Sequence, residues 1–191
     1  MPTLTLFDLD DTLAITDSKI KLRDADGQVV HRLTTNDYRD WKGQGKTEGF
    51  VADYEDFANV QKATELLVNA KPGPGLAILQ DAKETEGDLG ILTLRSSEEA
   101  VVKGLPKFLS RQGVNTRIDP KLIFALGDRK YSFPPVKIDS ELKLIVILKL
   151  LEEGPYDSIL LIDDDPMHKR VIDEYCASHD IKNIHVYLVA S

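Results

Sequence analysis

Five short apolar runs constrain the fold of this 191-residue chain more than any other feature. They are Leu4–Phe7, Leu89–Leu92, Leu122–Leu126, Ile159–Ile162 and Ile184–Val189. Each run has the length of a β-strand, and most are continuously apolar rather than alternating. That pattern is typical of strands covered on both faces, as in a parallel sheet.

Segments with helical spacing lie between these runs. The clearest has its apolar stripe after Ser140, a candidate N-cap, and stops at Gly154-Pro155. Another begins at Pro166, a residue suited to the first turn of a helix. A third, Val101 to Leu109, contains Pro106, which argues against an unbroken helix. Strands alternating with helices predict an α/β fold with a mostly parallel, five-stranded sheet.

Residues 14–72 interrupt this alternation. Two short runs, 19–23 and 28–33, flank Asp24-Ala25-Asp26-Gly27 and predict a hairpin. Residues 34–36 resemble the cap of a helix that continues to Trp41, and residues 50–69 are expected to be helical in part. We interpret 14–72 as an insertion in one domain spanning 1–191, because so short a segment buries little core alone.

Composition narrows the class of protein. The chain has 32 acidic and 24 basic residues, a formal charge of −8, which argues against coating nucleic acid by bulk charge. Residues 101–130 carry a local +5, for which solvation of a helix is the commoner reason. We expect a cytoplasmic protein without membrane partners, for three reasons. Cys176 is the only cysteine, the N-terminus has no targeting pattern, and the apolar runs are too short to span a membrane.

Polar residues follow three of the apolar runs. The run Leu4–Phe7 is followed by Asp8, Asp10 and Thr12. The run Leu89–Leu92 is followed by Thr93 and Arg95, and the run Ile159–Ile162 is followed by Asp163, Asp164 and Asp165. In open α/β sheets, ligands bind beyond the carboxyl ends of the strands. If the three strands are neighbours, these side chains converge on one edge of the sheet.

Carboxylates in such numbers oppose one another's ionisation. Mg²⁺ resolves the conflict, because it prefers oxygen ligands and is commonly shared between carboxylates and a substrate phosphate. Zinc is disfavoured, since no His or Cys accompanies the cluster at zinc spacing. The alternative, that each Asp merely caps a helix or turns the chain, suits a single site better than three coordinated strand ends.

These motifs resemble the haloacid dehalogenase (HAD) superfamily of phosphotransferases. Leu6-Phe7-Asp8-Leu9-Asp10-Asp11-Thr12-Leu13 matches its first motif, Ile91-Leu92-Thr93 the second, and Leu160-Leu161-Ile162-Asp163-Asp164 the acidic fourth. The resemblance covers residues 4 to about 170 and implies a Rossmann-like three-layer sandwich, with the insertion in place of a large cap.

The resemblance also implies roles for these residues. Asp8 would attack phosphorus to give an aspartyl-phosphate, and Asp10 would act as acid and then base. Thr93 and a lysine would hold the phosphoryl oxygens. Asp8, the backbone carbonyl of Asp10, and Asp163 would bind Mg²⁺, with Asp164 as a further ligand or a water holder. Thr12 and Arg95 are the expected substrate-binding residues, with a structural ion pair as the alternative for Arg95.

The lysine is ambiguous in the sequence. We favour Lys143, at the start of the helix that follows Ser140, over Lys137 in the preceding loop, although a surface position is the commoner fate of either. For His168, we favour a position on a helix facing solvent over one facing the substrate. Tyr38 and Trp41 either stack on a substrate ring or pack within the insertion.

The resulting hypothesis is a Mg²⁺-dependent phosphatase that acts on a phosphorylated small molecule or a phosphorylated nucleic-acid end. The alternatives are a phosphotransferase or mutase, a polynucleotide 3′-phosphatase, and a catalytically idle binding module. The small insertion leaves the site either open or closed by the hairpin and by another subunit, so a homo-oligomer is a further alternative.

Overall fold

The computed structural model describes residues 2–82, 87–136 and 139–190. Within them, the central sheet has the order β10-β9-β1-β7-β8, and every neighbouring pair is parallel. Its strands are β1 (Thr3–Phe7), β7 (Asp88–Thr93), β8 (Ile123–Ala125), β9 (Ser158–Asp163) and β10 (Ile184–Leu188). Each predicted apolar run supplies one strand, so the prediction of an α/β fold with a five-stranded parallel sheet is confirmed.

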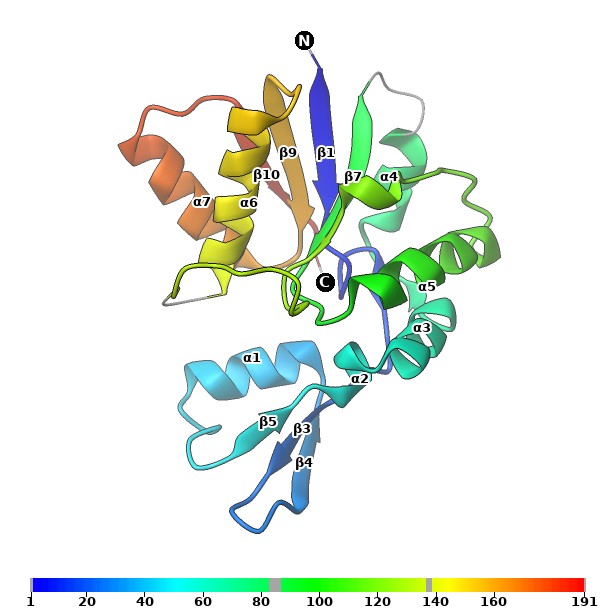
Figure 1. Cartoon of the computed structure of the whole chain (residues 1–191), viewed down its shortest axis with the longest axis vertical. Helices are drawn as coiled ribbons and strands as arrows, with labels where there is room; N and C mark the ends of the chain where they lie inside the picture. The colour runs from blue at the N-terminus through cyan, green and yellow to red at the C-terminus, as the bar shows by residue number, and fades with distance from the viewer. Residues whose placement is uncertain (1, 83–86, 137–138, 191) are drawn as a thin grey trace.

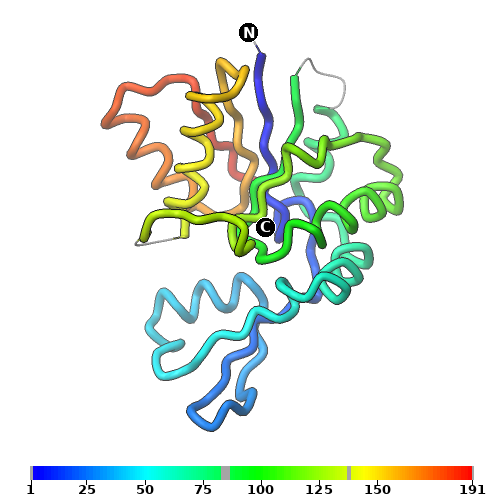
Figure 2. Tube along the Cα trace, in the orientation of Figure 1, coloured from blue at the N-terminus to red at the C-terminus, as the bar shows by residue number. Residues whose placement is uncertain are grey.

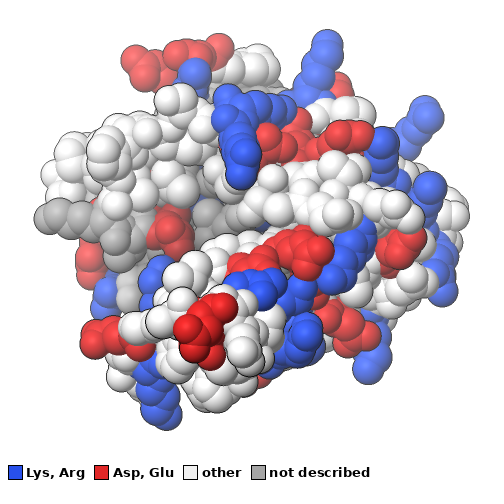
Figure 3. Space-filling view, turned by 60° about the horizontal axis from the view of Figure 1, so that its bottom comes forward, with Lys and Arg blue, Asp and Glu red and all other residues white. Residues whose placement is uncertain are grey.

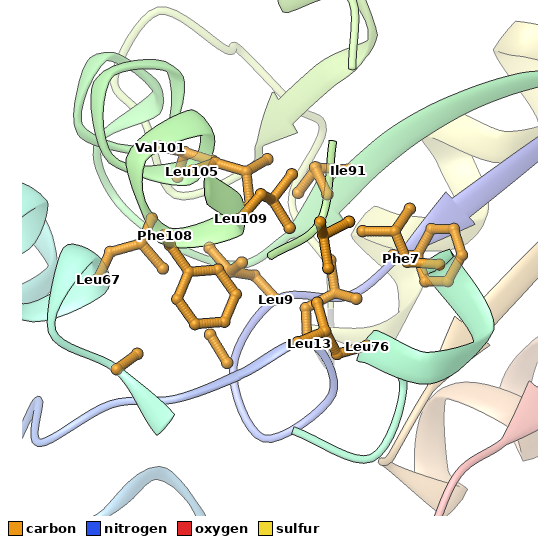
Figure 4. Close-up of a cluster of buried hydrophobic side chains, with 14 of the residues drawn as sticks. Phe7, Leu9, Leu13, Leu67, Leu76, Ile91, Val101, Leu105, Phe108 and Leu109 are labelled. Carbon is orange, nitrogen blue, oxygen red and sulfur yellow. The ribbon is translucent and has the colours of Figure 1, made fainter. Parts of the chain in front are cut away.

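Helices cover both faces of this sheet (Figure 1). On one side lie α4 (Leu76–Ala82) and α5 (Glu98–Arg111), and on the other lie α6 (Ser140–Glu153) and α7 (Pro166–Ser178). Strand β1 serves both layers, because Leu4 and Leu6 pack with α6 and α7 while Phe7 packs with α4 and α5. Figure 4 shows this second cluster around Phe7 and Phe108. Burying each such side chain contributes about 1.5–3 kcal/mol.

Two details of the helices differ from the sequence prediction. Helix α5 runs unbroken through Pro106, because Phe108 and its apolar neighbours bury one whole face against the sheet and against α3 (Val60–Val68) of the insertion. Ser140 is the first residue of α6 rather than its cap, which is Asp139. Ser140 is already helical and buried, so the cap position falls one residue earlier, at Asp139, which makes no side-chain capping hydrogen bond.

The insertion leaves the core after β1 and extends beyond the carboxyl edge of the sheet (Figures 1 and 2). Strands β2 (Ala14–Ile15) and β6 (Lys71–Pro72) pair at its neck. Its outer part is a sheet of β4 (Val29–Leu33), β3 (Ile20–Arg23) and β5 (Val51–Asp53), with α1 (Thr35–Gly43) between that sheet and the core. The hairpin and the cap at Thr34 are confirmed. Strand β5 was not predicted, because three half-exposed residues carry no apolar pattern.

The return limb of the insertion packs on the core. It consists of α2 (Glu55–Ala58) and α3 (Val60–Val68), and α3 lies along α5. The two helices approach closely at Gly104, where a Cβ would lie 3.1 Å from Leu67. Leu67 is fully buried in the same cluster as Phe108, as Figure 4 shows. The insertion is therefore a small outer sheet with one helix, held by a limb that belongs to the main core.

Candidate functional site

The candidate site begins where β1 and β9 end side by side. Their register pairs Phe7 with Ile162, so the next residues, Asp8 and Asp163, are neighbours at the carboxyl edge. The Asp8 amide extends the ladder by donating to the Ile162 carbonyl at 2.9 Å. Thr93 ends β7, the next strand, and is almost wholly buried. The predicted convergence of three strand ends on one edge is confirmed.

Lys143 joins the first two carboxylates. From α6 its Nζ donates to Asp8 Oδ1 and Asp163 Oδ2, both at 2.7 Å, and its side chain has no exposed surface. Lys143, the lysine that we favoured, is therefore buried beside these carboxylates and does not take the surface position commoner for a lysine. Lys137, the alternative lysine, lies outside the described residues.

His168 also contacts this group, contrary to its prediction as a solvent-facing residue. Its Nδ1 lies 3.0 Å from both carboxylate oxygens of Asp163, and the residue is buried. The reason is the tight start of α7, which Asp165 caps by accepting from the Met167 amide at 2.8 Å. The first turn of that helix folds back over the end of β9. Asp165 thus caps a helix, the alternative that the sequence left open for any single Asp at a strand end.

Asp164 is held from two directions. Thr12 Oγ1 donates to its Oδ1 at 2.9 Å from the loop after β1. Arg39 reaches it from α1, with Nη1 3.8 Å from Asp164 Oδ2 and 3.1 Å from Asp165 Oδ2. Sequence reasoning missed Arg39, because one basic residue on an amphipathic helix resembles an ordinary solvated charge.

The loop that carries Thr12 is tightly built. Asp11 adopts a left-handed conformation, φ 63°, and so turns the chain, the alternative that the sequence left open for a single Asp; its carboxylate accepts from the Thr35 hydroxyl of α1. Gly73 packs on the same loop: a Cβ there would lie 2.4 Å from the Thr12 carbonyl, so only glycine fits. The return of the insertion thus fixes the loop between Asp8 and Thr12.

Arg95 and Asp10 form a second pair beside this group. Arg95 Nε donates to Asp10 Oδ2 at 2.8 Å and Nη2 donates to Oδ1 at 2.6 Å. The guanidinium is buried over the Phe57 ring, 5.3 Å from its centroid. Among the described residues, its Nη1 has no hydrogen-bond partner. The ion pair named as the alternative for Arg95 is present, and contact with a substrate stays a prediction.

Burial and charge shift the pKa values of these groups in opposite directions. Burial, helped by repulsion from Asp163 and Asp164, holds the pKa of Asp8 well above its usual value despite the attraction of Lys143. Burial also acts to raise the pKa of Asp163, but Lys143 and His168 outweigh it and lower that pKa. Burial raises the pKa of Asp164, and repulsion from Asp163 and Asp11 adds to the effect. One buried lysine therefore cannot neutralise all three carboxylates.

Three of the four predicted metal ligands come together. Carboxylate oxygens of Asp8, Asp163 and Asp164 all lie within 4.8 Å of one another, close enough to share one cation. The Asp10 side chain is not in this group, because it faces Arg95. Its backbone carbonyl, the atom implied by the resemblance, stays a prediction.

Comparisons with protein-family models, with curated proteins and with solved structures found no match.

The remaining sequence candidates lie outside this group. Trp41 packs edge-on against His31, with ring centroids 4.9 Å apart, and the Tyr54 hydroxyl donates to Tyr38 at 2.9 Å. Both contacts are internal to the insertion. Figure 3 shows positive and negative side chains interspersed over the face that carries the insertion. None of the described helices combines the length and the apolar character needed to cross a membrane.

Proposed function

We propose that this chain is a Mg²⁺-dependent phosphatase of the HAD type, which hydrolyses a phosphomonoester through an aspartyl-phosphate. One observation carries the proposal: a buried lysine, Lys143, lies 2.7 Å from two aspartates that end adjacent parallel strands. This placement suits an enzyme whose carboxylate attacks a phosphate dianion. The lysine would offset the negative charge of both the attacking carboxylate and the phosphoryl group.

The donor set fits a divalent cation. Asp8, Asp163 and Asp164 offer only oxygen ligands, the kind that Mg²⁺ prefers, and their carboxylates lie close enough to repel one another. When bound, Mg²⁺ would offset this repulsion and the charge on the phosphoryl oxygens. No softer ligand lies among these three residues.

In the first half-reaction, a carboxylate oxygen of Asp8 forms a bond to phosphorus while the bond from phosphorus to the ester oxygen breaks. The leaving oxygen takes a proton from Asp10. Lys143 donates to a phosphoryl oxygen, and the buried Thr93 hydroxyl donates to another. Asp10 must turn from Arg95 to reach the leaving group, since both of its oxygens accept from the guanidinium.

In the second half-reaction, water attacks the phosphorus of the aspartyl-phosphate and gives its proton to Asp10. The bond between phosphorus and Asp8 breaks, which releases inorganic phosphate and restores both carboxyl groups to their starting states. Arg95 is suited to hold the substrate during this cycle, because its buried Nη1 has no partner among the described residues.

The substrate proposed is a phosphorylated small molecule or a phosphorylated nucleic-acid end, in the cytoplasm. The test is phosphate release from nucleotides, sugar phosphates and 3′- or 5′-phosphorylated oligonucleotides, with Mg²⁺ or with chelator. We expect Mg²⁺-dependent release that Asp8→Asn and Lys143→Met both abolish, whereas Lys149→Met, on the exposed side of the same helix, retains it. Equal release by wild type and Asp8→Asn would refute the proposal.

A further inference from the structure

The helix α1 is attached to the core by side-chain polar contacts. None of its residues, Thr35–Gly43, is buried. Three of them reach the core: Thr35 donates to Asp11, Arg39 lies 3.1 Å from Asp165, and Lys42 lies 3.5 Å from Asp139. Because the α1 aromatic residues pack within the insertion and not against the core, these polar contacts hold the helix over the site.

Arg39 differs from the other two in its partner. Besides Asp165 it reaches Asp164, which belongs to the trio that can hold a cation. The Asp164 side chain is only 5% exposed, and Asp163 and Asp11 lie near enough to repel it. Arg39 is the cation that the structure places against Asp164 to offset this repulsion.

We infer that Arg39 is a positioning residue that competes with a divalent cation for Asp164, so that cation binding weakens the attachment of α1 to the core. The inference rests on the cation site of the proposed function but not on hydrolysis. A guanidinium and Mg²⁺ bound to one carboxylate repel each other, so each lowers the affinity of the site for the other. The site is then covered while empty and opens to substrate when the cation is in place.

Lys42 provides a matched control. It lies on the same helix and carries the same charge, but its partner Asp139 is exposed and outside the trio. Lys42→Gln therefore changes the net charge of α1 as Arg39→Gln does, without removing a competitor from Asp164. Arg39→Lys keeps the charge and serves as the conservative variant.

The chain contains one tryptophan and one cysteine, which makes the seating of α1 measurable. Trp41 lies on α1 and serves as the donor for energy transfer. The acceptor is a dye on Met167→Cys, introduced into Cys176→Ser, because Met167 is exposed and lies two residues from Asp165. Transfer is followed during titration with Mg²⁺ alone, and calorimetry of the same samples gives the Mg²⁺ affinity.

We expect Mg²⁺ to lower the transfer in the parent protein. Arg39→Gln should bind Mg²⁺ about five-fold more tightly, the effect of one favourable ion pair, and should show low transfer before any Mg²⁺ is added. Arg39→Lys should restore both values, and Lys42→Gln, which loosens α1 without freeing Asp164 directly, should raise the affinity for Mg²⁺ much less than Arg39→Gln does.

Other results overturn the inference. If Mg²⁺ binds but Arg39→Gln and Lys42→Gln have the same affinity, Arg39 is not a competitor, while the proposed function stands. If Mg²⁺ binds with the expected Arg39 dependence and no substrate is hydrolysed, the competition stands and the phosphatase proposal fails. If no Mg²⁺ binds in the millimolar range, both fail.

Discussion

Replacing Lys143 with methionine tests the charge balance of the site through stability rather than activity. The side chain is wholly buried and serves two carboxylates at 2.7 Å, so Lys143→Met keeps the volume but leaves Asp8 and Asp163 without their shared cation. Removing one partner of a buried ion pair costs about 3–5 kcal/mol. The free energy of unfolding of a domain is about 5–15 kcal/mol, so the variant should fold but be much weakened.

The assay is urea unfolding followed by circular dichroism, in chelator at neutral pH. In thermal unfolding, the same loss of about 3–5 kcal/mol corresponds to a fall in Tm of about 6–20 °C for a chain of this size. Lys149→Met is the control, because that lysine lies on the same helix with its side chain 68% exposed and should change stability by less than about 0.5 kcal/mol.

The pH dependence gives a second readout. Without Lys143, burial should hold the folded-state pKa values of Asp8 and Asp163 above their unfolded values. Both side chains are then neutral at low pH, and the folded protein loses stability as pH rises through the folded pKa and they ionise. The deficit of Lys143→Met should therefore grow from pH 5 to pH 8. A loss below about 1 kcal/mol, or a deficit that does not vary with pH, refutes the view that Lys143 balances two ionised neighbours.

Three further predictions concern single substitutions. Asp8→Asn should stabilise the chelated protein by about 0.5–2 kcal/mol, because burial raises the pKa of Asp8 and penalises its charge; a lower Tm would contradict this. Burial acts to raise the pKa of Asp56, but its hydrogen bonds with Lys62 and a backbone amide outweigh it and lower that pKa. Asp56→Asn should thus cost about 1–2 kcal/mol at pH 7 and less as pH falls below about 4, and an equal cost at pH 3 and pH 7 counts against it. Gly104→Val should cost about 1–3 kcal/mol in urea unfolding by crowding Leu67, and an unchanged midpoint would show that α3 can shift.

Sequence reasoning recovered the features that local chemistry determines. The apolar runs predict the sheet because a strand buried on both faces must be apolar throughout, and Leu4, Leu6 and Phe7 are all buried. The convergence of Asp8, Thr93 and Asp163 follows from strand polarity once β9, β1 and β7 are neighbours, since carboxyl ends of parallel strands meet at one edge.

The features that were missed depend on how helices and strands pack and not on local sequence pattern. The sequence around His168 gives no sign that the residue is buried. Its contact with Asp163 forms only when α7 packs against the end of β9. Arg39 contacts Asp164 although the two residues are 125 positions apart, and no pattern near Arg39 in the sequence predicts that contact. Strand β5 exists because β3 offers it an edge to pair with, which a three-residue segment cannot reveal.

The packing of α3 on α5 has a consequence for rebuilding this protein. The sequence predicts limits of the insertion at residues 14 and 72, yet Leu67 lies in the main core and Phe57 packs under the Arg95 guanidinium of the site. A graft that exchanged the whole segment would therefore remove part of the core and a support of the site. The exchangeable module ends with β5 at Asp53, so outer sheets of different shape can be tried on this scaffold if α2 and α3 are retained.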